Sequence, residues 1–319
     1  MGGICLRTLT ERILAWRAPL FCDEVVIDTE LLCNVDPKRK VNRTAMKTIL
    51  LGTGTPNAEP DRSGPSVAIT ASGSSFVVDC GPGVVRMASR AYEMGVSQLK
   101  PDKLSNLFLT HLHSDHTAGF PDFILTPWVL GREKPLRVWG PPGTGRMIRC
   151  ILDAYASDIK ERLEGLEPAN TTGWQVIFQE VSPGIVLENE DMKVECFPVN
   201  HGGLPSFGYR FTESGETVVI SGDTAPFAEM KKCYSNCRTL VHEVYSSKGL
   251  QKRSDHWKRY HRSVHTSADE LAEMASTVNP ELLVLYHQLL HGVEEEELME
   301  EIKSRYKGEV VYGRDLDTF

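Results

Sequence analysis

Short apolar or alternating runs recur along the chain from residue 46 onward, separated by turns rich in glycine, proline and aspartate. Runs of this length and period predict β-strands. The expected strands cover residues 48–51, 66–70, 75–79, 107–109, 136–139, 174–178, 192–197, 207–211, 217–220, 240–244, 282–286 and 309–312.

Apolar residues spaced three and four positions apart predict helices between several of these strands. The expected helices cover residues 84–94, 147–163, 226–233, 266–278 and 294–306. Ser267, followed by Asp269 and Glu270, is typical of a helix N-terminus. Residues 246–262 are polar and basic, and we expect an exposed loop there.

The strands fall into two halves with helices between them, which predicts an α/β fold with two sheets between helical layers. Residues 1–45 stand apart from this pattern and end in the charged stretch 36–40. The sequence therefore predicts an N-terminal extension, residues 1–45, and one folded domain, residues 46–319.

Composition and charge narrow the class of protein. The 319 residues are 41% hydrophobic and 24% charged, as in a globular protein. The net charge of −8 argues against a broad nucleic-acid-binding surface. The eight cysteines are scattered and include no Cys-x-x-Cys pair, which favours reduced thiols in a cytoplasmic protein. We expect no membrane span and no secretion signal.

Candidate metal ligands gather in the stretch 107–120, LFLTHLHSDHTAGF. The apolar run at its start leads directly into His111, His113, Asp115 and His116. Extended residues at i and i+2 point the same way, so His111 and His113 can reach one ion together. Nitrogen and oxygen ligands at the end of a buried strand are typical of a metal site.

Three further polar residues follow predicted strands: His201, Asp223 and His287. In layered α/β folds, strand ends at one edge of a sheet converge on a site. We therefore expect these three residues to meet the residues of the first stretch.

The order His111-Leu112-His113-Ser114-Asp115-His116, then His201, Asp223 and His287, resembles the metallo-β-lactamase superfamily over residues 46–319. This resemblance implies a four-layer αββα sandwich and two zinc ions, although Mn²⁺ and iron accept similar ligands. The implied ligands are His111, His113 and His201 for the first ion, Asp115, His116 and His287 for the second, and Asp223 as a bridge.

Within the superfamily, the chain is most similar to the ribonuclease Z and arylsulfatase branch. The stretches Ser221-Gly222-Asp223-Thr224 and His265-Thr266-Ser267-Ala268 carry this similarity. It implies that His265 protonates or stabilises the leaving group and that Glu243 assists His265. Asp115 is expected to have a catalytic role besides its role as a ligand.

Three departures separate the chain from ribonuclease Z. Pro82 follows Asp79-Cys80-Gly81 where a glutamate is usual, and Gln288 follows His287 where a phenylalanine is usual. Residues 158–170 are acidic, whereas ribonuclease Z carries a Gly/Pro-rich tRNA-gripping arm in this interval. These features favour an arylsulfatase-like hydrolase.

Our first hypothesis is a dinuclear zinc hydrolase that uses a metal-bridging hydroxide on small esters: sulfate, phosphate or carboxylic esters, or lactones. The alternative is a ribonuclease Z-type endonuclease that cleaves tRNA at its 3′ end. A third hypothesis is a non-catalytic metal-binding scaffold. The expected partner is a small-molecule ester, with tRNA second, and a homodimer is compatible with the resemblance. Arg62 and Arg210 are candidates for holding an anionic substrate.

Overall fold

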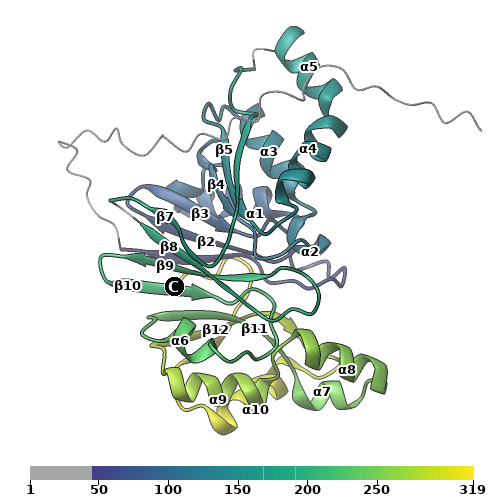
Figure 1. The fold of residues 1–319 in the computed structure, drawn as a ribbon, viewed down its shortest axis with the longest axis vertical. Helices are drawn as coiled ribbons and strands as arrows, with labels where there is room; N and C mark the ends of the chain where they lie inside the picture. The colour runs from purple at the N-terminus through teal and green to yellow at the C-terminus, as the bar shows by residue number, and fades with distance from the viewer. Residues whose placement is uncertain (1–44, 168, 191) are drawn as a thin grey trace, which may run out of the picture. The chain divides into compact units, whose positions relative to one another are not determined.

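The computed structural model describes residues 45–319, except residues 168 and 191 (Figure 1). The predicted N-terminal extension lies outside the described residues apart from Ala45, so its boundary stays a prediction. The first strand begins at Lys47.

Thirteen described strands form two mixed sheets. The first sheet contains, in spatial order, β1 (Lys47–Gly52), β2 (Ser66–Ala71), β3 (Ser74–Val78), β4 (Asn106–Phe108), β5 (Leu136–Gly140) and β6 (Val176–Glu180). The second contains β13 (Val310–Tyr312), β12 (Leu282–Leu289), β11 (Thr239–Tyr245), β10 (Glu216–Ile220), β9 (Phe207–Glu213), β8 (Lys193–Pro198) and β7 (Gly184–Glu188).

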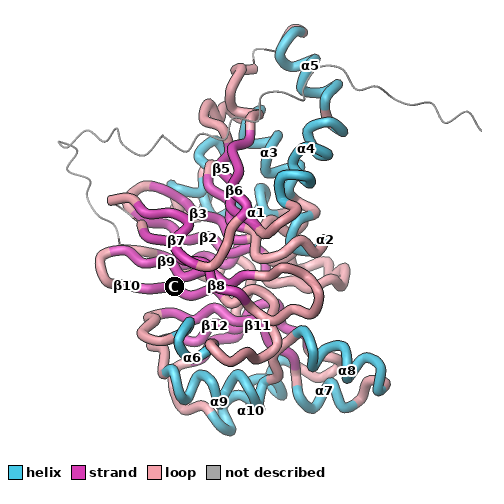
Figure 2. The backbone as a smooth tube through the Cα atoms, in the orientation of Figure 1, coloured by secondary structure: helices cyan, strands magenta, loops and turns pink. Residues whose placement is uncertain are grey.

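Helices cover the outer face of each sheet (Figure 2). Those that follow strands of the first sheet are α1 (Val84–Glu93), α2 (Ser114–Thr117), α3 (Phe120–Val129), α4 (Thr144–Ala154) and α5 (Ala156–Glu164). Those that follow strands of the second sheet are α6 (Met230–Tyr234), α7 (Ser247–Gln251), α8 (Asp255–Val264), α9 (Ala268–Val278) and α10 (Glu295–Arg305). Short 3₁₀ turns occupy Ser97–Leu99 and Pro101–Lys103.

Three large apolar clusters of described residues hold these layers together. The central cluster fills the space between the sheets, where Phe108 stacks on Trp139 with ring centroids 4.6 Å apart. Phe211, from the second sheet, meets Phe108 edge to face at 5.4 Å. The other two clusters join each sheet to its helices. The predicted αββα sandwich is confirmed.

Strand direction determines where the candidate ligands lie. Strands β3 to β6 run parallel to one another, and so do β10 to β13. The carboxyl ends of parallel strands share one edge of a sheet. Backbone and side-chain bonds also join the two sheets near this edge, because Phe207 N donates to Thr110 O and the Tyr209 hydroxyl donates to Leu109 O.

The expected loop at residues 246–262 is wrong, because this segment forms α7 and α8. The segment is mostly polar, so its few inward-facing residues did not give a recognisable helical pattern. These buried residues are Leu250 in α7 and His261 and Val264 in α8. The Ser246 hydroxyl also accepts a bond from Gly249 N and caps α7. Apart from His261, the charged and polar residues of α8 lie on its outer face.

Other element boundaries differ from expectation. The single helix predicted at residues 147–163 is broken at Tyr155 into α4 and α5. Helix α6 begins at Met230 rather than at Pro226. Helix α3 and strand β7 were not predicted, and the prolines Pro121 and Pro127 within α3 disguised its pattern. Among the described residues, no helix is long and apolar enough to cross a membrane.

Candidate metal centre

The stretch after β4 delivers four of the predicted ligands to the shared edge. The chain stays extended through His113, which has φ −67° and ψ 152° and stands immediately before α2. Asp115 and His116 lie on the single turn of α2. His111 and His116 are fully buried, because the apolar strand carries them into the interior.

The second sheet supplies the other three predicted ligands. His201 follows β8 and Asp223 follows β10, both as predicted from strand ends. His287 instead lies within β12, which continues to Leu289. The pairing of β11 with β12 skips His287, and this residue has φ +46°. His287 therefore occupies a β-bulge, a device that re-aims a side chain.

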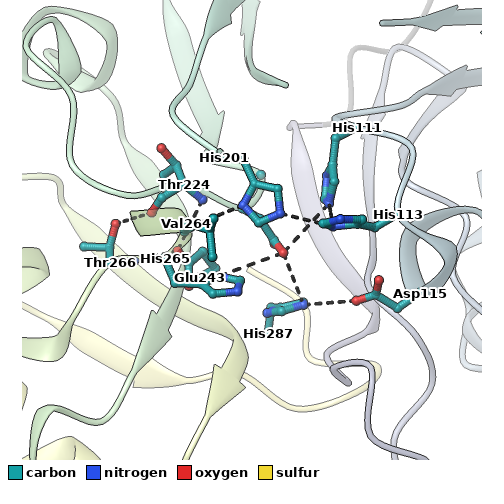
Figure 3. A network of polar contacts seen from close by, with 12 residues as sticks. His111, His113, Asp115, His201, Thr224, Glu243, Val264, His265, Thr266 and His287 are labelled. Atoms are coloured by element: carbon teal, nitrogen blue, oxygen red, sulfur yellow. Dashed lines mark hydrogen bonds and ion pairs between the residues drawn. The ribbon is translucent and has the colours of Figure 1, made fainter. Parts of the chain in front are cut away.

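Three histidine nitrogens converge at one side of the centre (Figure 3). His113 Nδ1 lies 3.0 Å from His111 Nε2 and 3.1 Å from His201 Nε2. These are the three residues predicted for the first ion.

The other side of the centre contains Asp115, His116 and His287. Asp115 Oδ2 lies 3.5 Å from His116 Nε2 and 3.3 Å from His287 Nε2. These three residues match the set predicted for the second ion.

Asp223 lies between the two groups. Its Oδ2 atom is 3.4 Å from His116 Nε2, 3.5 Å from His287 Nε2 and 3.9 Å from His111 Nε2. One carboxylate oxygen thus faces nitrogens of both groups, as a bridging ligand requires.

Hydrogen bonds outside the centre orient three of the rings. His201 Nδ1 donates to Val264 O at 2.7 Å, and His116 Nδ1 donates to Asp79 Oδ2 at 2.8 Å. The Thr110 hydroxyl donates to the same Asp79 oxygen at 2.8 Å, so it accepts from His111 Nδ1 at 3.0 Å. In the neutral tautomer that these bonds select, each Nε2 atom carries no proton and faces the centre.

Asp79 is a site residue that the sequence analysis did not assign. It follows β3, has φ +61°, and also accepts a bond from Thr110 N at 2.8 Å. The available signal was its position, since an aspartate directly after a buried strand lies at the same edge as the ligands. Its role depends on the His116 ring that lies beside it in the fold, and the two residues are 37 positions apart in the chain.

The donor set fits metal ions. The Nε2 atoms of His111 and His201 both lie next to Nδ1 of His113. That nitrogen can donate at most one proton, so at least one of the two Nε2 lone pairs has no donor. Among described residues, the buried atoms His116 Nε2 and Asp223 Oδ1 have no hydrogen-bond partner. Buried polar atoms without partners are rare, and cations bound at this point would satisfy them.

His265 and Glu243 adjoin this centre from the second sheet. His265 Nδ1 lies 3.4 Å from Glu243 Oε2 and 4.0 Å from Asp223 Oδ2. Glu243 Oε1 accepts bonds from Thr266 N at 2.8 Å and from Thr224 N at 3.3 Å, which fixes the carboxyl group. Glu243 thus lies where it can orient His265.

Burial and the charges within the centre act in opposite directions on the pKa values of its residues. Burial lowers the pKa of His265 to about 4 and, together with His116, holds the pKa of His111 well below its usual value. Burial would raise the pKa of Asp223, but His287 and His116 outweigh it and hold this pKa well below normal. His111 and His265 therefore favour their neutral form. The negative charge of Asp223 instead raises the pKa values of His116 and His287, and Asp223 itself favours its charged form. Bound cations would displace the protons of these two rings.

The two arginines considered for substrate binding have protein partners. Arg62 donates to Gln288 Oε1 and to Thr53 O, and pairs with Glu59 at 2.8 Å. Arg210 donates to the carbonyls of Cys233 and Ser235. Both side chains thus have structural contacts.

A sequence profile described as a beta-lactamase superfamily domain matches residues 75–288. The chain belongs to this superfamily. It is 32% identical to ribonuclease Z of Mycolicibacterium gilvum over 277 residues, which cover 85% of this chain and 94% of the relative. As a superfamily member with the metallo-β-lactamase fold, it is a metal-dependent hydrolase.

Solved structures of this superfamily share the fold. The short form of human tRNase Z aligns with a TM-score of 0.65 at 21% identity, covering 86% of this chain and 98% of that protein. The metallo-β-lactamase fold protein YhfI of Bacillus subtilis aligns with a TM-score of 0.64 at 18% identity, with the same coverage. These comparisons do not support the expected arylsulfatase-like character. They support the similarity to ribonuclease Z.

Proposed function

We propose that this superfamily hydrolase is a ribonuclease Z-type phosphodiesterase, which cleaves precursor tRNA at its 3′ end. The observation that carries this proposal is the similarity to ribonuclease Z, which extends over 94% of that relative's length. This reverses our first preference for small esters. The departures at Pro82 and Gln288 are single positions, and they weigh less than a similarity along the whole body of the chain.

The residues that would hold two zinc ions are those grouped above. Zinc accepts imidazole nitrogens and carboxylate oxygens, and both kinds of ligand face the centre. His111, His113 and His201 would hold one ion, and Asp115, His116 and His287 the other. Asp223 would contact both. When bound, such ions activate water at neutral pH and stabilise the charge that develops on a phosphate.

The chain's own residues would position and complete this chemistry. Asp79, Thr110 and Val264 hold three ligand rings in the orientation that binding requires. His265, next to Asp223, would support departure of the leaving oxygen, and Glu243 would position His265. Preorganised groups of this kind add to the rate because they need no rearrangement during the reaction.

A substrate panel tests this proposal. The full-length, metal-loaded protein is incubated with precursor tRNA and, separately, with aryl phosphate, aryl sulfate and lactone substrates. We expect efficient cleavage of the tRNA at a single position and slow turnover of the small esters. Efficient turnover of one small ester, with the tRNA left intact, would overturn the assignment in favour of our earlier hypothesis.

A further inference from the structure

A row of stacked rings leads from the metal centre to the protein surface along α8. The His287 ring stacks on His265 at 5.8 Å, and His265 stacks on His261 at 5.6 Å. His261 in turn stacks on Trp257 at 5.7 Å, with 28° between the ring planes. Trp257 and His261 are one helical turn apart, so α8 presents them on the same face.

The outer end of this row is exposed. Trp257 is 43% exposed and Tyr260 is 40% exposed, and the two rings meet edge to face at 5.7 Å. The two exposed rings, nearly perpendicular to each other, present apolar aromatic surface to water. We call these two residues the Trp257–Tyr260 platform.

Tyr260 connects the platform electrostatically to the metal centre. Burial of part of the ring raises the pKa of its hydroxyl, and the negative charges of Asp223 and Asp115 raise it further. The ring contacts from His287 through His265 and His261 give the geometric link, because they end at Trp257. The platform is therefore the outer end of a continuous row of rings that begins at the candidate metal centre.

The charge around the platform favours a polyanion. Residues 252–262 include five basic residues and one acidic residue, in a chain whose net charge is −8. The Arg253 guanidinium lies over the Trp257 ring, 5.7 Å from its centroid, and Lys258 pairs with the exposed Asp255 at 3.6 Å. Neither Arg259 nor Arg262 has a carboxylate partner among described residues.

We propose that the Trp257–Tyr260 platform stacks on a nucleobase of the RNA substrate, close to the bond that the metal centre cleaves. This inference rests on the proposed function and names how the site would hold its substrate. Single-stranded nucleic acids bind by stacking on aromatic rings within basic surroundings, and α8 combines both features. Figure 1 shows α8 next to α7, apart from the pair α9 and α10.

The kinetic test compares W257A and W257F with the wild-type protein on precursor tRNA and on bis(p-nitrophenyl) phosphate. We expect W257A to raise KM for the tRNA about tenfold, which is the loss of one base–aromatic stack, and W257F to retain most of the affinity. The activity of W257A on bis(p-nitrophenyl) phosphate should equal that of the wild-type protein. Y92A is the matched control, because Tyr92 is also 40% exposed but lies on α1. It should leave both substrates unaffected.

An equal loss on the small diester would overturn the inference, because Trp257 would then serve the site itself or any aryl group. A change of oligomeric state in W257A without a change in KM would also overturn it, because the platform would then bind a second copy of the chain.

A binding measurement separates this inference from the proposed function. The wild-type holoenzyme is titrated with a phosphorothioate oligoadenylate while its tryptophan fluorescence is recorded. We expect quenching that is absent in W257F. If the oligoadenylate quenches the fluorescence of the wild-type protein but the protein cleaves no tRNA, base stacking on the platform is supported and the proposed function is wrong. If it cleaves tRNA with no quenching and an unchanged KM in W257A, only the platform fails.

Discussion

Asp79 illustrates how much of the centre depends on residues that are not ligands. Its carboxylate accepts bonds from His116, from the Thr110 hydroxyl and from the Thr110 backbone. It therefore fixes one ring directly and another through Thr110. Partners of this kind set both the tautomer and the direction of a ligating histidine.

The substitution D79N should weaken metal binding without unfolding the protein. Asparagine tolerates the left-handed backbone at φ +61°, but its amide group cannot accept the bonds from His116 and Thr110 equally well. We expect metal affinity to fall about 10–100-fold. Competition with a chelator measures this loss, and an unchanged affinity would show that Asp79 does not orient His116.

His265 should act on turnover and not on metal content. It lies next to Asp223 without belonging to either predicted ligand triad, so H265A should keep its metals and slow turnover by roughly 10²–10⁴-fold. Metal analysis and kcat on precursor tRNA provide the two readouts. H256A, at an exposed histidine of α8, is the control. Full turnover in H265A would remove this residue from the mechanism.

At the scale of elements, the bulge in β12 shows where sequence reasoning stops. The apolar run up to Tyr286 predicts a strand and places His287 near its end, and His287 does reach the centre. The strand nevertheless continues to Leu289, because the extra residue is absorbed by a positive φ at His287. A bulge depends on pairing with β11, and no pattern within β12 reveals it.

A second element-scale feature is the close packing of the turn after β3 against the backbone of Asp115. A Cβ atom at Gly81 would lie 2.3 Å from Gly64 C and 2.6 Å from Asp115 O. We expect G81A to displace the turn that carries Asp115, to lower the free energy of unfolding by about 1–3 kcal/mol and to reduce turnover.

Urea denaturation and steady-state kinetics measure both effects of G81A. G203A is the matched control, since an added Cβ at Gly203 has no atom within 4 Å. If G81A and G203A have the same free energy of unfolding and the same turnover, the turn accommodates the added Cβ atom without displacing Asp115.

At the scale of the whole molecule, the sequence predicts the sandwich and which residues meet at the shared sheet edge, but it does not predict every helix around that edge. All twelve predicted strands occur, because each depends on a local apolar pattern. The joining of two sheets at one edge follows from contacts such as Tyr209 to Leu109, between residues far apart in the chain. Helix α8 was missed because its exposed face is basic, yet its inner face leads to the centre.

A metal titration tests whether one chain holds two metal ions between its sheets. Protein freed of metal with a chelator is titrated with Zn²⁺, while bound metal per chain and phosphodiesterase activity are recorded together. Seven side chains in two groups, with Asp223 between them, predict two ions per chain and full activity only at the second equivalent. Saturation of both binding and activity at one ion per chain would show that the chain works with a single metal ion and not with two.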